Sequence, residues 1–112
     1  MELTTRRWER VDMLKVKGRV DHQTAPEMEK ALRAMLDEGR HNIVVDMSEV
    51  PYISSAGLKV LQAMAKAARS GVRPGDVRLA GLQPNIADIF STIGLTQFFK
   101  IYSEPVDAVG SF

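Results

Sequence analysis

Two adjacent serines, Ser54 and Ser55, stand where a loop enters a predicted helix, and the small residues Ala56 and Gly57 follow them. Serine is a preferred helix N-cap, so this position alone explains why one of them is there. The first turn of a helix also presents unpaired amides and the positive end of the helix dipole. A phosphate, which carries about −1.5 to −2 charges at pH 7, is well accommodated at such a place. The pair therefore indicates either an ordinary helix start or a serine that a kinase can phosphorylate.

The sequence lacks the residues and motifs of the common metal sites, nucleophiles and nucleotide-binding loops. The chain has no cysteine, which excludes disulfides, thiolate zinc sites and cysteine nucleophiles. Its only histidines, His22 and His41, lie in separate predicted loops without the spacing of metal ligands. Neither a Gly-x-Ser-x-Gly elbow nor a phosphate-binding P-loop is present. We therefore expect a protein that is not an enzyme and that has no metal site and no cofactor.

Length and charge narrow the class of protein further. The 112 residues predict one domain over 1–112, and 45% hydrophobic residues suffice for one core. No apolar run approaches the ~20 residues of a membrane-spanning helix, and the N-terminal MELTTRRWER lacks the apolar region of a signal peptide. Fifteen basic and 14 acidic residues give a formal charge of +1, unlike a nucleic-acid-binding domain. We expect a cytoplasmic monomer that binds neither nucleic acid nor membrane.

The chain opens with two predicted strands, residues 4–10 and 12–20, and the short gap between them indicates an antiparallel pair. Trp8 in the first strand is expected to cover one side of the sheet. In the second strand, alternate residues share one face because side chains alternate along a strand: Leu14, Val16, Gly18 and Val20.

The first predicted helix spans about residues 25–38 and ends before Gly39. Its start has the form of a capping box, in which the Thr24 hydroxyl caps free amides and the Glu27 carboxylate reaches back. Pro26 is tolerated in the first turn. Apolar residues at helical spacing form one stripe: Met28, Ala31, Leu32, Met35 and Leu36.

The run Ile43-Val44-Val45 has no polar alternation and ends at Asp46, which predicts a strand buried on both faces. A loop over 47–53 leads to a helix over about 55–70. The remaining predicted elements are a strand over 77–80, a helix from Pro84 to Gly94 with Ile86, Ile89, Phe90 and Ile93 facing inward, a strand over 98–102 and a short helix near 104–109.

This order of elements predicts an α/β fold. Strands that alternate with helices need crossover connections, which produce a parallel sheet flanked by helices. We expect a mainly parallel sheet of about five strands, with the first pair antiparallel, and about four helices.

Three segments resemble a known family, the STAS domain of the anti-sigma factor antagonists. The segment 46–58, DMSEVPYISSAGL, is similar to the signature of that family: an aspartate after a buried strand, an aromatic-aliphatic pair, two small hydroxyl residues and Gly-Leu. The segment 18–25, GRVDHQTA, resembles its Gly-x-x-Asp-x-x-Thr-Ala stretch, and the run over 86–98 resembles its C-terminal third. The resemblance covers nearly the whole chain.

The resemblance implies a protein that switches partners. Such a protein binds an anti-sigma factor, itself a GHKL-type serine kinase, and so frees a sigma factor. The kinase then phosphorylates a serine of the signature, and a metal-dependent, PP2C-type serine phosphatase resets it. Alignment on Gly57 makes Ser55 the phosphorylated residue and Ser54 the runner-up. The implied partner surface consists of Asp21, Tyr52, Ile53, Ser54, Ala56, Gly57 and Leu58.

Two positions depart from the family pattern. Ser54 stands where the family usually has aspartate, and Ala56 replaces a second hydroxyl residue. Asp21 matches the loop aspartate of the family, for which the resemblance implies polarisation of the serine hydroxyl or contact with the kinase; the residues alone equally indicate an aspartate beside a helix start. An alternative function within the same family is a constitutive accessory subunit of a lipid-transport ABC system.

Overall fold

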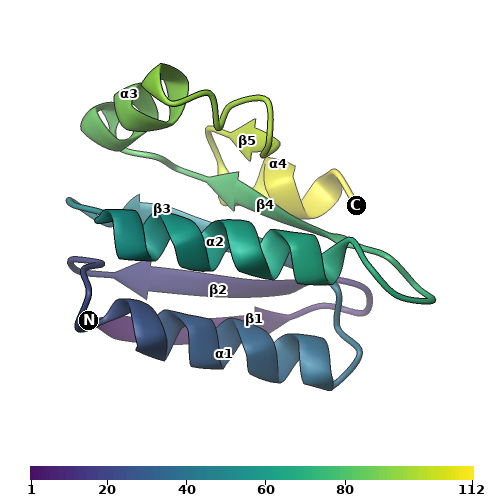
Figure 1. Ribbon diagram of the computed structural model, residues 1–112. Helices are drawn as coiled ribbons and strands as arrows, with labels where there is room; N and C mark the ends of the chain where they lie inside the picture. Colours follow the sequence, from purple (N-terminus) through teal and green to yellow (C-terminus); the bar gives the residue numbers. More distant parts are fainter.

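Five strands form one sheet whose order follows the chain, β1-β2-β3-β4-β5, in the computed structural model, which describes residues 1–112 (Figure 1). β1 and β2 are antiparallel, and the other neighbours are parallel, so the predicted α/β fold with an antiparallel first pair is confirmed. The strands are β1 (Glu2–Arg7), β2 (Asp12–Lys17), β3 (Asn42–Glu49), β4 (Asp76–Ala80) and β5 (Ile101–Tyr102). The helices are α1 (Ala25–Asp37), α2 (Ser55–Ala68), α3 (Pro84–Thr92) and α4 (Pro105–Gly110).

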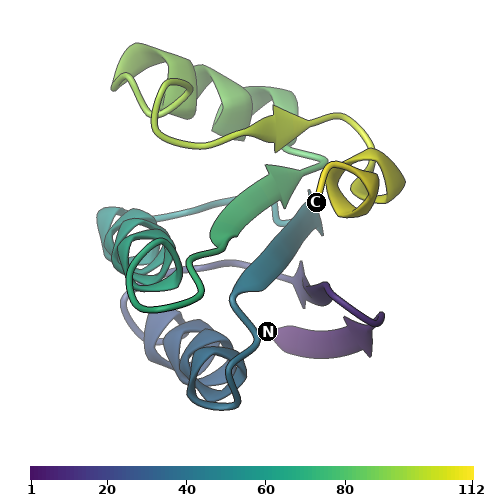
Figure 2. The same cartoon turned by 90° about the vertical axis from the view of Figure 1, so that its right-hand side faces the viewer.

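The order of the strands fixes the side on which the connecting helices lie. From β2 to β5 each strand is added on the same side of the previous one, and crossovers between parallel strands are right-handed. Under these two conditions α1, α2 and α3 must all pack on one face of the sheet. Buried residues from these three helices do join one core cluster with β2, β3 and β4. Only α4, which follows the last strand, lies on the other face (Figure 2).

The central strand is buried on both faces, as the run Ile43-Val44-Val45 predicts. Ile43 and Val45 lie in the core under the three helices, and Val44 lies in the smaller cluster under α4. The strand continues past Asp46 to Glu49, further than predicted, because its later residues still pair with β2. No helix has both the length and the hydrophobicity that a membrane-spanning segment needs.

Several predicted boundaries are wrong at the chain's turns. β1 stops at Arg7, because the Trp8 amide donates to the Val11 carbonyl (2.8 Å) in the turn to β2. β2 stops at Lys17, before Gly18 with its positive φ of 109°. The predicted strand over 98–102 is reduced to Ile101–Tyr102 because residues 93–99 form turns.

The prediction that Ile93 faces inward on α3 is also wrong. Ile86 and Phe90 are buried, but Ile93 is 53% exposed. Ile93 is the C-cap of α3, and its amide still bonds the Ile89 carbonyl (3.1 Å), but its side chain lies at the exposed end of the helix.

A buried ion cluster ties the β1–β2 turn to the end of α1, and the sequence patterns did not indicate it. Asp12 is fully buried and accepts hydrogen bonds from the guanidinium groups of Arg7 and Arg40. Hydrogen bonds from Arg7 to Asp12, and next to Glu38, raise the pKa of the Arg7 guanidinium. Because a buried carboxylate needs such partners, this cluster stabilises the end of the sheet remote from Ser55.

Candidate functional site

The two segments that carry the sequence motifs lie side by side beyond the ends of β2 and β3. Val20 forms a parallel bridge with Ile53: its amide donates to the Tyr52 carbonyl (2.9 Å), and its carbonyl accepts from the Ser54 amide (2.8 Å). The pairing continues the sheet past its regular strands. It therefore brings the turn that begins at Asp21 next to the start of α2, where the two serines stand.

Asp21 organises its own turn. Its Oδ1 accepts hydrogen bonds from the amides of Gln23 (3.0 Å) and Thr24 (3.1 Å), whereas Oδ2 forms no hydrogen bond within the chain. The bond from the Thr24 amide is the main reason that the pKa of the Asp21 carboxyl is lowered. The carboxylate is thus held in place with one oxygen free.

The predicted capping box at the start of α1 is wrong. The Thr24 hydroxyl donates to the Arg19 carbonyl (2.9 Å) and accepts from the Asp21 amide (2.9 Å), so it does not cap α1. The exposed Glu27 makes no hydrogen bond back to the turn. The Asp21 carbonyl instead accepts the Ala25 amide (2.8 Å). Local competition by the Asp21 turn therefore replaces the capping box.

The two serines have different roles at the start of α2. Ser54 is the N-cap, in extended conformation (φ −87°, ψ 171°), and its hydroxyl accepts the Gly57 amide at 3.4 Å. Ser55 is the first residue of the helix, is exposed, and its hydroxyl forms no hydrogen bond within the chain. One serine is therefore engaged in the fold and the other is free for a partner.

Gly57 allows the close approach of α2 to the Val20–Ile53 bridge. A Cβ at this position would lie 2.7 Å from Val20 Cγ1 and 2.8 Å from Ile53 Cγ1, closer than real carbon atoms approach. Since both neighbours are β-branched, neither side chain swings away easily. The glycine of the Gly57-Leu58 motif therefore has a packing role, which fixes the height of the serines above the sheet.

Side chains at the start of α3 hold the end of β3 and the loop before α2. Gln83 Nε2 donates to the Ser48 carbonyl (3.1 Å), and Asn85 Nδ2 donates to the Pro51 carbonyl (3.0 Å). On the other side, the Arg19 guanidinium lies 4.3 Å from the centroid of the Tyr52 ring. Sequence reasoning missed these contacts, because residues more than 30 positions apart in sequence leave no local pattern.

The structure distributes the predicted partner residues between surface and interior. Tyr52 is 40% exposed, and Asp21, Ser54, Ala56 and Leu58 are partly exposed. Ile53, with 4% exposure, and Gly57 are buried. The accessible surface is thus formed by the Asp21 turn, Tyr52 and the first turn of α2, and it rests on Ile53 and Gly57.

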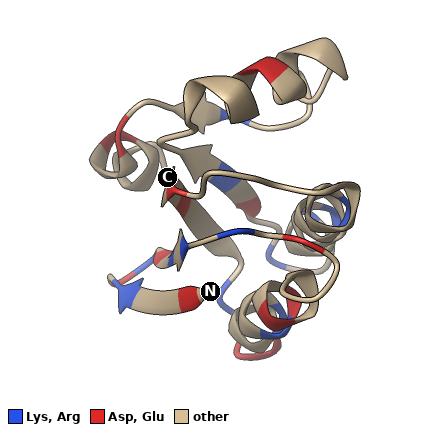
Figure 3. Ribbon diagram, turned by 90° about the vertical axis from the view of Figure 1, so that its left-hand side faces the viewer, with Lys and Arg blue, Asp and Glu red and all other residues tan.

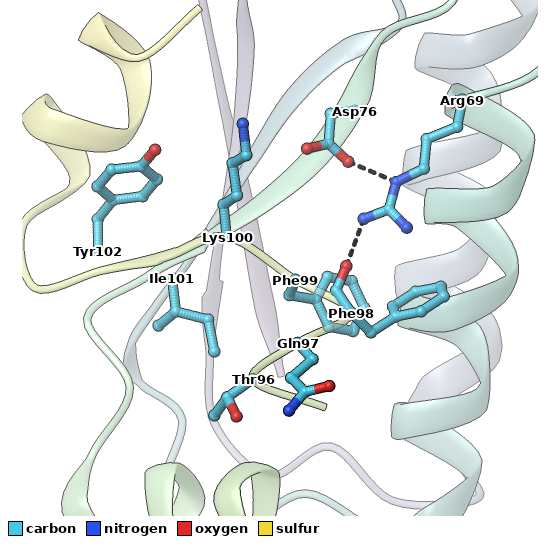
Figure 4. A pocket seen from close by; sticks show the side chains of 9 residues that line it. All are labelled: Arg69, Asp76, Thr96, Gln97, Phe98, Phe99, Lys100, Ile101 and Tyr102. Atoms are coloured by element: carbon cyan, nitrogen blue, oxygen red, sulfur yellow. Dashed lines mark hydrogen bonds and ion pairs between the residues drawn. The ribbon is translucent and has the colours of Figure 1, made fainter. Parts of the chain in front are cut away.

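A cavity of about 580 Å³ lies away from this surface, at the β5 edge of the sheet (Figure 4). Arg69 crosses its wall, with Nε bonded to Asp76 (2.7 Å) and Nη2 to the Phe98 carbonyl (2.7 Å). Arg69 and Asp76 are thus paired with each other, and none of the lining residues belongs to the segments 18–25 and 46–58.

Comparison with known proteins identifies the family. The sequence model of the STAS domain family matches residues 2–108 of the chain. The chain belongs to the STAS domain family. A relative from Bordetella bronchiseptica, BtrV, named as a candidate anti-sigma factor antagonist, is 31% identical over 87% of this STAS domain and 82% of its own length.

Solved structures agree with this fold. The crystal structure of an anti-sigma factor antagonist from Mycobacterium paratuberculosis has a TM-score of 0.86 at 26% identity and covers 98% of this STAS domain and 92% of that chain. The phosphorylated form of SpoIIAA, a cell fate determinant of Bacillus, has a TM-score of 0.76 with 98% coverage of both chains. Its identity is 13%, so this likeness concerns the fold alone.

Proposed function

We propose that this STAS domain is a cytoplasmic anti-sigma factor antagonist that acts by binding and has no enzymatic activity of its own. In its unphosphorylated form it binds an anti-sigma factor that is also a GHKL-type serine kinase. The kinase phosphorylates Ser55 and the complex dissociates, and a PP2C-type phosphatase restores the binding form. The names of its sequence relatives support this function, and they give no support to the alternative of an accessory subunit of a lipid-transport system.

The contrast between the two serines is the observation that favours Ser55 over Ser54. A kinase needs an accessible hydroxyl that is not already used in the fold, and the exposed Ser55 meets this condition. The Ser54 hydroxyl already accepts a hydrogen bond from the Gly57 amide. Serine and aspartate are equally good N-caps, so Ser54 keeps the capping function at the position where the family usually has aspartate.

The surroundings of Ser55 explain how one structure tolerates both forms. A phosphate on the first residue of α2 lies at the positive end of the helix dipole. Lys59 is four residues further along α2 and exposed, a spacing at which side chains of opposite charge pair on a helix. We therefore expect phosphorylation to leave the fold intact and to change only the affinity for the partner.

The same phosphate disrupts an interface formed over this helix end. Tyr52 and Leu58 offer partly exposed apolar surface on either side of Ser55, and a partner that covers them must also cover the phosphate. Burial of an unpaired charge is costly. A loss of about 3 kcal/mol of binding free energy weakens affinity about a hundredfold, enough to release the partner.

The test is phosphorylation in a purified system. The protein is mixed with ATP and each GHKL-type kinase from the same genome, and tandem mass spectrometry locates the phosphate. We expect phosphate on Ser55 in the parent and in Ser54→Ala, and none in Ser55→Ala. Phosphate on Ser54 would refute the assignment but keep the switch.

Binding of the same kinases separates the switch from the alternative. We expect the parent and Ser55→Ala to bind one kinase, the phosphorylated parent to bind at least about a hundredfold more weakly, and Tyr52→Ala to bind weakly without phosphorylation. A protein that no kinase phosphorylates or binds, and that instead forms a stable complex with a transporter subunit, would favour the accessory-subunit function.

A further inference from the structure

One half of the sheet's second face is left without a covering helix. The three crossover helices lie on the first face, and α4 contacts β3, β4 and β5. The face of β1 and β2 on that side is therefore open, and Figure 3 shows basic and acidic positions along these two strands. The pair is antiparallel, and antiparallel strands commonly leave one face in solvent, so this half of the sheet is accessible to a ligand.

A groove of about 560 Å³ runs between α4 and the β1–β2 turn on this open half. Its size falls in the range of small-molecule sites, about 300–1,000 Å³. The apolar part of its lining comes from the turn, from β2 and from α4: Trp8, Met13, Pro105, Val106 and Val109. The polar part consists of Arg6, Lys15 and Asp46.

Asp46 supplies a buried carboxylate with an unused oxygen. The residue is 5% exposed and its Oδ1 accepts the Ser48 amide at 3.0 Å. Its Oδ2 has no hydrogen bond or ion pair within the chain. Lys15 is its neighbour across the β2–β3 pair, but the Lys15 ammonium is engaged 2.8 Å from Glu49. Because no fully buried side-chain oxygen of the structure is without a partner, this oxygen is accessible from the groove, where a cationic donor can bind it.

Arg6 supplies the matching unused cation. Its guanidinium lies 4.8 Å from the centroid of the Trp8 ring and takes part in no ion pair. The ring holds the guanidinium at the edge of the groove through a cation–π contact. The groove therefore presents one free positive and one free negative group beside an apolar surface.

We propose that this groove binds a free α-amino acid with a large apolar side chain. The ligand's ammonium donates to Asp46 Oδ2, its carboxylate pairs with the Arg6 guanidinium, and its side chain packs on Met13 and Val109. A zwitterion pairs with both groups at once, whereas a simple amine or a simple carboxylate pairs with only one of them. The proposal concerns a face remote from Ser55 and does not depend on the proposed function.

The single tryptophan of the chain makes the test direct. Trp8 is the only tryptophan and lines the groove, so its fluorescence reports occupancy when it is excited where tyrosine and phenylalanine do not absorb. The probe is L-phenylalanine, and for so small a ligand we expect a dissociation constant of about 1 mM. We expect a saturable change of the Trp8 emission in this range.

Blocked ligands and matched variants test each contact. N-acetyl-phenylalanine lacks the ammonium and phenylalaninamide lacks the carboxylate, and we expect each to bind at least about tenfold more weakly. The variants Asp46→Asn and Arg6→Gln should lose affinity to the same extent. Asp88→Asn and Arg10→Gln, which change the same residue types outside the groove, should bind as the parent does.

A folding control and two binding results decide the test. The side-chain carbonyl introduced by Asp46→Asn can still accept the Ser48 amide, so we expect this variant to fold, and its melting temperature checks this. If that variant does not fold, Arg6→Gln and the blocked ligands carry the test. No saturable change up to about tenfold the predicted constant, or equal affinity for free and blocked phenylalanine, would overturn the proposal.

Discussion

Replacement of Gly57 by alanine tests whether close packing sets the position of the serines. Within a helix this change normally stabilises by about 0.5–1 kcal/mol, because glycine loses more entropy on folding. Here the new Cβ would lie 2.7 Å from Val20 Cγ1 and 2.8 Å from Ile53 Cγ1. Overpacking of this kind costs about 1–3 kcal/mol. We therefore expect a net loss of about 1 kcal/mol and a melting temperature lower by about 4 °C.

Urea unfolding followed by circular dichroism measures this loss. Gly110→Ala is the matched control, because a Cβ at Gly110 meets no atom within 4 Å, and it should be neutral or stabilising. A Gly57→Ala protein as stable as the parent would contradict the packing argument.

A double-mutant cycle isolates the contact itself. In a Val20→Ala background the Cγ1 atom at 2.7 Å is gone, so Gly57→Ala should cost at least about 0.5 kcal/mol less than in the parent. Additive effects of the two substitutions would show that Val20 is not the obstacle.

Three further predictions concern charge and capping. Asp12→Asn should lower the free energy of unfolding by about 1–2 kcal/mol in urea, because it weakens the charge-assisted hydrogen bonds of Arg7 and Arg40, while both arginines keep other partners; an unchanged free energy of unfolding would mean that the cluster is replaceable. Ser54→Ala should cost about 0.5–1 kcal/mol, at the low end for an N-cap because its hydrogen bond is long, and a melting curve unchanged from the parent's would argue against the cap. The pKa of Asp21 is lowered by folding, so its contribution to stability is present above the unfolded pKa of about 3.9 and is lost as pH falls through the folded value; unfolding measured from pH 7 down to about pH 3 should therefore show a smaller acid-induced loss in Asp21→Asn than in the parent.

The parts of the fold that were predicted are those with a local pattern. Helical spacing of apolar residues located α1, and the run Ile43-Val44-Val45 located the central strand. The crossover rule then gave the parallel sheet. The family resemblance predicted a site that includes Asp21 and Ser55, and the Val20–Ile53 bridge is the physical reason that the segments carrying these residues lie side by side.

The parts that were mispredicted depend on competition between neighbours or on distant contacts. The sequence from Thr24 to Glu27 fits a capping box, but the Thr24 hydroxyl has nearer partners in the Asp21 turn. Ile93 fits the helical repeat, but its side chain lies at the exposed end of the helix. Neither the pairing of Asp12 with Arg40, 28 residues away, nor the open groove beside α4 has a local signal.

The agreement between strand order and chain order has a kinetic consequence. Each strand pairs with the next one in sequence, so no strand must wait for a segment from the far end of the chain. Pairing with the next strand in sequence loses less loop-closure entropy than pairing with a strand from the far end of the chain, although a helix still separates each parallel pair. During synthesis, the β1–β2 pair, α1 and β3 can assemble first, and each later helix-strand unit can add to an edge already in place. The signature serines at the start of α2 would thus be positioned before β5 and α4 have left the ribosome.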